Sequence, residues 1–328
     1  MHCKLKSVII HGLMKQTVII PEHYQNSRLD QALAKLMPQF SRTQIQTWIE
    51  EGRVLVNGVK PQAKLRLKGG ETVTIEPIIE EKTHFLPQAI SLDILYEDEA
   101  LLIVNKAAKM VTHPGAGNPQ DTLLNALLHH CPTLNMLPRA GILHRLDKGT
   151  SGLLIVAKTG ETFRDLSQQL KKRTLQREYQ TIVAGRLISG GQVSEPIGRH
   201  PIARKRMAVV ETGKKAVTHY RIIEKYRAHS HLRVQLETGR THQIRVHMAH
   251  IGHPIVGDAT YGGRLTLVKG MTPTLIDTLR HFKRQALHAY ALGFTHPLTK
   301  ELVRFESDLP EDMQQLVNIL QKDKDSKK

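Results

Sequence analysis

The side chain best placed to do chemistry is Asp147, which lies between basic residues in the run GILHRLDKGTSG (141–152). The apolar run LLIVAK follows and is typical of a buried strand. A carboxylate on a loop that enters such a strand is fixed by the scaffold and still reachable. Nearby His144 and Arg145 favour its ionised form, which can act as a nucleophile or a base. A structural ion pair at the start of a strand explains the same residues, so both interpretations stay open.

The longer run GILHRLDKGTSGLLIVAK resembles the signature of pseudouridine synthases that act on large ribosomal RNA. Four more runs match that family in the same order: NKAAKMVTHPGAGNP, LQREYQTIVAG, GRTHQIRVHMAHIGHPIVGDATYGG and RQALHAYALGFTHP. The likeness covers nearly the whole chain after residue 17. It implies an α+β pseudouridine synthase fold with a mixed, largely antiparallel sheet flanked by helices. It also implies isomerisation of uridine without any cofactor or metal.

The resemblance assigns roles to four residues. Asp147 matches the essential aspartate, which attacks the uridine or removes a ribose proton so that the glycosidic bond breaks. Tyr179 matches an active-site tyrosine that stacks on the base, and Arg245 matches the basic partner of the aspartate. Arg145 matches the arginine that fills the gap left by a flipped-out nucleotide. Taken without the resemblance, Tyr179 fits a core strand, and both arginines fit phosphate contacts.

The chain departs from the family pattern at three positions. Gly149 stands where many relatives carry an acidic residue, and Ala107 and Lys109 replace a proline and a glycine. None belongs to the expected triad of Asp147, Tyr179 and Arg245. The departures therefore concern loop geometry and not the reaction.

Composition independently favours a nucleic-acid partner. Lys and Arg number 47 against 30 Asp and Glu in 328 residues, which gives a formal charge of +17. Such a surplus of positive charge indicates that the protein binds a polyanionic partner. Two cysteines, Cys3 and Cys131, cannot form a disulfide framework. Without a signal peptide or membrane span, we expect a cytoplasmic, monomeric protein with no membrane partner.

The first part of the chain predicts a small RNA-binding module over residues 17–78. Two short helices lead into the two-residue turn Asn57-Gly58, and the strand 72–75 closes the unit. Ser27 and Ser41 are the expected helix caps. The run SRTQIQTWIEEGRVLVNG resembles the S-four RNA-binding domain, which implies that Arg28, Arg42 and Arg53 contact RNA. A small αβ domain with a solvated basic face is the alternative.

The remaining boundaries follow from composition. Residues 1–16 are expected to be an unstructured leader, 79–90 a linker, 91–310 the catalytic domain and 311–328 a polar, frayed tail. Apolar runs at 101–104 and 152–156 predict buried strands, and irregular mixing of strands and helices favours α+β over a doubly wound fold.

Two basic features remain. His242, His247, His250 and His253 lie within a dozen residues, but no acidic or thiol ligand is interleaved, so RNA contacts or helix packing are favoured over a metal site. The loop that carries Arg204 and Arg206 suits contact with RNA phosphates. A solvated loop is the alternative.

The runs EPIGRHPIARKRMAV, GKKAVTHYRI and RLTLVKGMTPTLIDTLRHFKRQ most resemble the D-type branch of the family. That branch modifies helix 69 of 23S ribosomal RNA, at the nucleotides numbered 1911, 1915 and 1917. The partner implied is this RNA, free or within a large-subunit particle. Four alternatives are a C-type enzyme acting elsewhere on the same RNA, an enzyme acting on transfer RNA, a non-catalytic ribosome-assembly factor, and a metal-dependent nuclease.

Overall fold

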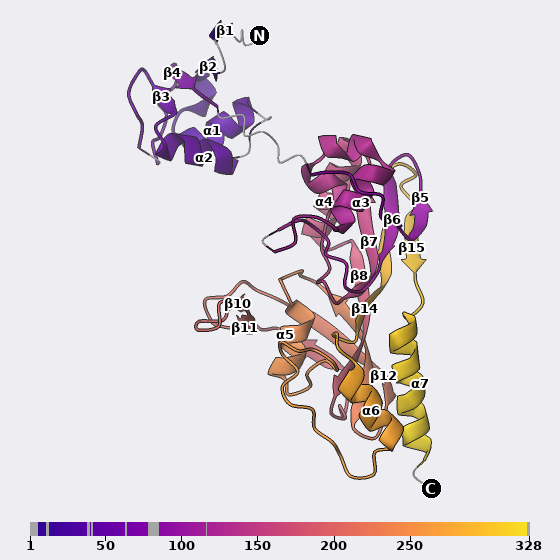
Figure 1. The fold of residues 1–328 in the computed structure, drawn as a ribbon. Coiled ribbons are helices and arrows are strands. Elements are labelled where there is room, and N and C mark those ends of the chain that lie inside the picture. Colours follow the sequence, from indigo (N-terminus) through magenta and orange to yellow (C-terminus); the bar gives the residue numbers. More distant parts are fainter. Residues whose placement is uncertain are drawn as a thin grey trace. The chain divides into compact units, whose positions relative to one another are not determined.

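The computed structural model describes residues 6–10, 13–37, 40, 42–62, 64–77, 85–115 and 117–326 (Figure 1). The chain forms two compact units, Met1–His84 and Phe85–Lys328. The division falls inside the expected linker. Residues 85–90 belong to the second unit, where Gln88 donates a side-chain hydrogen bond to Asp121 and accepts one from its backbone N–H.

Over its described residues, the first unit is a four-stranded antiparallel sheet with two α-helices packed on it. The sheet order is β1-β2-β4-β3. Its elements are β1 (Lys6–Ile10), β2 (Leu13–Ile19), η1 (Glu22–Tyr24), α1 (Leu29–Leu36), α2 (Arg42–Glu50), β3 (Val54–Val56) and β4 (Thr72–Ile75). Apolar side chains of α1, α2 and the strands form one hydrophobic core. Leu29, Leu33 and Ile45 of the two helices are fully buried in it.

Two expectations for this unit are wrong. The segment expected to be an unstructured leader contains β1 and the start of β2, because β2 pairs with β4 and gives β1 an edge to pair with. Helix α1 has Arg28 as its N-cap residue, without a side-chain cap, and not Ser27. The other expected cap, Ser41, lies outside the described residues. Asn57 and Gly58 both have positive φ, 50° and 81°, as the predicted two-residue turn requires.

The second unit is built on a nine-stranded sheet among its described residues. Its order is β5-β6-β7-β14-β8-β13-β12-β9, with β15 paired to β14. All neighbours are antiparallel except the parallel pair β7 and β14. The strands are β5 (Ile94–Glu97), β6 (Leu101–Lys106), β7 (Ser151–Ala157), β8 (Gln176–Ala184), β9 (Gly191–Val193), β12 (Thr218–Lys225), β13 (His229–Leu236), β14 (Leu287–Thr295) and β15 (Leu302–Glu306). The mixed, largely antiparallel α+β architecture is confirmed.

Helices flank this sheet, and a small hairpin extends from it. They are α3 (Leu123–His130), η2 (Pro132–Met136), η3 (Pro138–Gly141), α4 (Gly160–Lys172), α5 (Gln243–His250), α6 (Pro273–His281) and α7 (Glu311–Asp325), with the hairpin strands β10 (Ile197–Arg199) and β11 (Met207–Val209). In Figure 1, α6 and α7 lie beside each other near the C-terminal end. None of the helices in the described ranges is apolar over a length that could cross a membrane.

The expected frayed tail is wrong over residues 311–325, which form α7. Met313, Leu316 and Leu320 follow helical spacing and are buried in the main core. Asp323 is also buried and accepts hydrogen bonds from Arg227 and from the backbone N–H of Thr272. Three apolar residues on one face anchor this helix although its composition is mostly polar.

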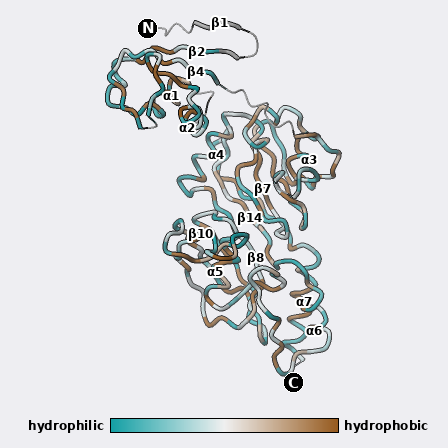
Figure 2. The backbone as a smooth tube through the Cα atoms, turned by 60° about the vertical axis from the view of Figure 1, so that its left-hand side comes forward, coloured by the Kyte–Doolittle hydropathy of each residue, from teal (hydrophilic) through white to brown (hydrophobic). Residues whose placement is uncertain are grey.

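The central strands β6 and β7 are buried on both faces. Leu102 and Leu154 contribute to one hydrophobic cluster, whereas Leu101 and Leu153 contribute to another. Figure 2 shows the corresponding apolar colouring along β7 and β14. Alternate side chains of a strand point to opposite faces, so a strand covered on both sides needs a continuous apolar run, as the sequence predicted.

Candidate active site

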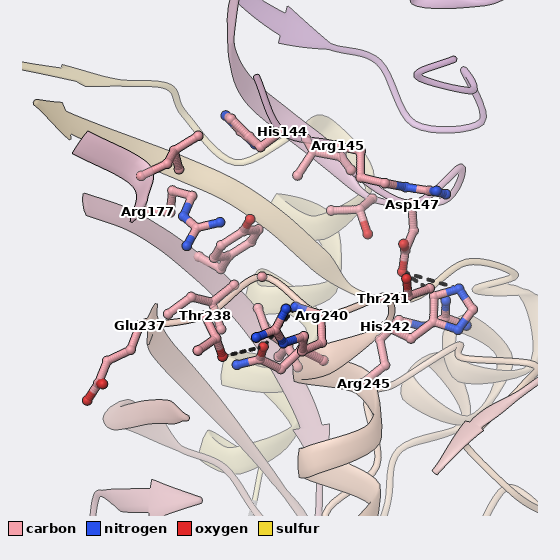
Figure 3. Close-up of a pocket in the computed structure, with 18 of the residues that line it drawn as sticks. His144, Arg145, Asp147, Arg177, Glu237, Thr238, Arg240, Thr241, His242 and Arg245 are labelled. Atoms are coloured by element: carbon pink, nitrogen blue, oxygen red, sulfur yellow. Dashed lines mark hydrogen bonds and ion pairs between the residues drawn. The ribbon is translucent and has the colours of Figure 1, made fainter. Parts of the chain in front are cut away.

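The three residues expected to form the catalytic triad line one open pocket of about 600 Å³. Asp147 comes from the loop before β7, Tyr179 from β8 and Arg245 from α5. In Figure 3, Asp147 points toward His242 and Arg245, and Arg145 lies beside it. The pocket is within the size range of small-molecule sites and can take a nucleoside.

Backbone contacts fix the loop that carries Asp147. The buried hydroxyl of Thr112 donates to the carbonyl of Leu146 at 2.8 Å and accepts from its N–H at 3.3 Å. Three residues after Asp147, the N–H of Thr150 donates to the Asp147 carbonyl at 3.0 Å. The carboxylate therefore stands on a short loop held on both sides.

Gly152 allows β7 to approach β14 closely enough to position this loop. Its φ is +112°, and an added Cβ would lie 2.6 Å from the backbone nitrogen of Ala289. A larger residue would separate the parallel pair and shift the preceding loop. The requirement explains the last glycine of the HRLDKGTSG run.

Two of the departures from the family pattern have structural explanations. Lys109 has φ +73°, a left-handed conformation that suits the glycine found in relatives. At Gly149, an added Cβ would lie 2.9 Å from the Gln285 side-chain carbon, so Gln285 fills the space there. The Gln285 amide donates to the Thr150 hydroxyl at 3.1 Å. For Ala107 the structure offers no comparable account.

Buried Lys106 supports the loop that precedes Thr112. Its Nζ donates to the carbonyls of Ala107 and Met110 at 2.8 and 2.9 Å. Burial lowers the pKa of Lys106 to about 7; Asp147 opposes this shift and Arg284 adds to it. The sequence did not mark this residue because it ends an apolar strand.

Arg245 joins Asp147 to a second carboxylate, Asp258. Its Nη1 donates to Asp147 Oδ2 at 2.9 Å, while Nε and Nη2 donate to Asp258 at 2.7 and 2.9 Å. Burial opposes the charge of Arg245, but the two carboxylates raise its pKa above the ordinary value. Burial by itself would raise the pKa of Asp258. The hydrogen bonds and the positive charge of Arg245 outweigh burial, so the net pKa of Asp258 lies below its ordinary value. The bidentate pair aims the third nitrogen at Asp147.

Tyr179 is 5% exposed and forms part of the pocket wall. On the sheet it lies opposite Val234 of β13 and Ala289 of β14. Burial raises the pKa of Tyr179, and Asp147 acts in the same direction, whereas Arg177 opposes. Its phenol is therefore protonated at neutral pH.

His144 does not supply the positive charge expected from the sequence. Burial, assisted by Arg177, lowers the pKa of His144 to about 3. In Figure 3 its ring points away from Asp147. Positive charge instead comes from Arg245, whose Nη1 lies 2.9 Å from Asp147 Oδ2, and Arg145 lines the same pocket.

The four clustered histidines have separate environments. His247 contacts the Thr218 hydroxyl and the Glu195 carbonyl, and His253 contacts the Ala184 carbonyl. His242 lines the pocket, and His250 is exposed at the end of α5. Within the part of the chain that the structure describes, no three His, Cys, Asp or Glu side chains are grouped to hold a metal ion.

The expected RNA-contacting arginines fall into three places. Arg145 lines the pocket. In the first unit, Arg28 and Arg42 both donate to buried Asp30, and Arg53 donates to Glu51. Arg204 and Arg206 are exposed on the loop between β10 and β11.

Sequence reasoning missed two residues that organise the site, Asp258 and Tyr261. Tyr261 lies 5.0 Å below the Arg245 guanidinium, and its hydroxyl contacts His242 Nδ1 at 2.8 Å. Both belong to the run GDATYGG, whose presence in a family motif was the one available signal. The contact partners lie 13 to 19 residues away, too far for any spacing rule to pair them.

Comparison with known proteins identifies the class to which this fold and site belong. Residues 100–250 match the family described as RNA pseudouridylate synthase, and residues 27–73 match the S4 domain. The solved structure "Human RNA Pseudouridylate Synthase Domain Containing 1" is 25% identical, with a TM-score of 0.53 over 71% of this chain and 96% of that chain. A second, "Human RNA Pseudouridylate Synthase Domain Containing 4", shares the fold with a TM-score of 0.55 over 70% of this chain and 92% of that chain, at 22% identity.

The chain belongs to the RNA pseudouridylate synthase family and is an RNA pseudouridine synthase, as its motifs predicted. Relatives named "Ribosomal large subunit pseudouridine synthase D" are similar over most of their length. That of Escherichia coli (strain K12) is 51% identical over 94% of both chains. That of Xanthomonas campestris is 50% identical over 93% of this chain and 92% of the relative.

Proposed function

We propose that this enzyme converts uridine to pseudouridine in 23S ribosomal RNA, at positions 1911, 1915 and 1917 of helix 69, with Asp147 as the nucleophile. The observation that carries the proposal is the 2.9 Å contact between Arg245 Nη1 and Asp147 Oδ2 inside a nucleoside-sized pocket. The names of the similar proteins support ribosomal RNA as the substrate. The charge of +17 and the S4 match support RNA binding.

The reaction moves one bond and needs no external reagent. Asp147 attacks the uridine or removes a ribose proton, and the bond from ribose C1′ to uracil N1 breaks. The uracil rotates and C5 bonds to C1′; the bond that Asp147 formed then breaks, or Asp147 returns the ribose proton that it removed. The C5 hydrogen leaves as a proton, and N1 takes up a proton. Arg245 holds the Asp147 carboxylate in position through the hydrogen bond from its Nη1. Tyr179 stacks on the base, and its hydroxyl assists proton exchange at C5.

The target nucleotide must leave its stack before Asp147 can reach it, which costs a few kcal/mol. In our proposal, Arg145 fills the space that the flipped-out nucleotide leaves in the RNA stack. Phosphates are contacted by arginines of both units: Arg28, Arg42, Arg53, Arg204 and Arg206. RNA binding by the unit Met1–His84, catalysis by the unit Phe85–Lys328, a monomeric state and a cytoplasmic location complete the proposal. The substrate is free RNA or a large-subunit particle.

The test is a map of pseudouridine across 23S ribosomal RNA. Cells lacking the gene are compared with cells complemented by the wild-type chain or by Asp147→Asn. We expect the three helix 69 sites to disappear on deletion and to return only with the wild type. Loss of pseudouridine at other positions of 23S ribosomal RNA would reject helix 69 as the target but would still support the proposed reaction. An unchanged map would reject the function.

A further inference from the structure

His242 occupies a backbone conformation that residues other than glycine seldom adopt. It precedes α5 with φ +58° and ψ +20°, the left-handed region, and makes no side-chain cap to the helix. Outliers of this kind in non-glycine residues cluster at functional sites. The conformation directs the ring into the pocket, where Nε2 lies 3.8 Å from Asp147 Oδ2 (Figure 3).

Tyr261 determines which nitrogen of His242 carries the proton. The Tyr261 oxygen accepts the N–H of Met207 at 2.9 Å and lies 2.8 Å from His242 Nδ1. Among the described residues, donation to Nδ1 is the one arrangement that uses the hydroxyl hydrogen. Nδ1 is then the acceptor, so the hydrogen of the neutral ring is on Nε2, facing Asp147.

The neutral state of His242 follows from its surroundings. Burial lowers the pKa of His242, and the attraction of Asp147 only partly opposes this. The charged groups that face the ring are Asp147, Arg245, Asp258 and Arg145. A neutral N–H donor does not compete with Arg245 for a salt bridge to the nucleophile.

Any uridine in reach of Asp147 is also in reach of His242 Nε2, because the two groups are 3.8 Å apart. We propose that the Nε2–H of His242 donates a hydrogen bond to the uracil carbonyl oxygen O2, next to the glycosidic nitrogen. Negative charge gathers on that oxygen as the C1′–N1 bond breaks. A fixed N–H donor stabilises such charge, as in an oxyanion hole. The inference rests on the proposed function and adds a fourth catalytic residue to it.

The test compares His242→Asn with His242→Gln. The Gln amide reaches the place of Nε2, whereas the shorter Asn amide reaches only the place of Nδ1. Asn tolerates the left-handed backbone better than most residues. A purely structural role therefore predicts that Asn is the milder change, and a donor at Nε2 predicts the reverse.

The assay measures release of tritium from C5 of uridine in 23S ribosomal RNA. We expect His242→Asn to lower kcat roughly 100-fold with little change in KM. His242→Gln should restore kcat to within about 10-fold of the wild type, because it returns the donor. Equal loss in both variants, or an unchanged kcat in the Asn variant, would overturn the proposal. Asp147→Asn in the same assay tests the proposed function separately, since activity there would reject the nucleophile.

A second variant, Tyr261→Phe, keeps the ring beneath Arg245 and removes the hydroxyl. Without the hydroxyl, Nδ1 loses its hydrogen-bond donor, and the hydrogen of the neutral ring is no longer held on Nε2. We therefore expect kcat to fall with little change in KM. An unchanged kcat would contradict the assigned tautomer.

Discussion

Replacing Asp258 by Asn tests whether the Arg245 pair organises the site. Asp258 is fully buried and Arg245 is 7% exposed, so solvent screens the pair little. Oδ1 accepts from Arg245 and from the N–H groups of Thr260 and Tyr261, and Oδ2 accepts from Arg245 Nε. An Asn can keep the Oδ1 bonds, but its NH₂ then faces the Nε–H as a second donor.

The magnitude follows from these contacts. Removing one partner of a buried ion pair costs about 3–5 kcal/mol. In the variant, Asp147 remains as a partner for Arg245. We therefore expect Asp258→Asn to lower the free energy of unfolding at pH 7 by about 3 kcal/mol, the lower end of that range. Because the Arg245 guanidinium is then no longer held in its position beside Asp147, kcat should fall by roughly 10- to 100-fold.

The pH dependence has a definite sign. The folded-state pKa of Asp258 is lowered, so its contribution to stability is complete above the unfolded value of about 4. It is lost as the pH falls through the lower folded pKa. The stability difference between wild type and Asp258→Asn should therefore be full at pH 7 and shrink below about pH 4.

Urea unfolding at several pH values measures the difference, with tritium release as the activity assay. Asp277→Asn is a matched control, because Asp277 is 74% exposed and forms an ion pair with His281 in the same helix. The control should change stability by less than about 0.5 kcal/mol. A decrease of less than about 1 kcal/mol in the free energy of unfolding of Asp258→Asn would refute the reasoning. A stability difference that does not change with pH would refute it as well.

Three further predictions concern the loops and the RNA. Gly152→Ala should destabilise the second unit by about 3 kcal/mol, because its Cβ meets the backbone of Ala289; a change under about 1 kcal/mol in urea unfolding would argue against close strand approach. Lys109→Gly should raise stability by about 1 kcal/mol, since φ is +73°; lower stability would mean that Lys109 makes a compensating contact. RNA affinity should fall steeply as salt rises, given the charge of +17; a flat salt titration would reject phosphate-driven binding.

Much of the fold was predictable because its signals are local. The apolar runs of β6 and β7 identify strands covered on both faces, and the Asn57-Gly58 turn has the positive φ pair that its residues predict. Helix α7 was missed because the polar and charged residues of its 15-residue span outnumber the apolar ones that pack on the core. The edge strand β1 was missed because its pairing depends on β2, which pairs with a strand more than 50 residues away.

The site was predictable only as far as the motifs extend. Asp147, Tyr179 and Arg245 line one pocket as expected from the family resemblance. The links from Arg245 to Asp258, and from His242 to Tyr261, depend on how the chain turns after α5. The neutral state of His144 depends on burial, which sequence neighbours do not reveal.

The most direct test of the account is a single-turnover measurement on purified enzyme and unmodified 23S ribosomal RNA. Asp147→Asn keeps the size of the side chain and a possible contact to Arg245, but removes the nucleophilic charge. We predict that pseudouridine formation becomes undetectable while RNA affinity stays within a few-fold of the wild type. Formation at the wild-type rate would contradict the central claim that the Asp147 carboxylate performs the reaction.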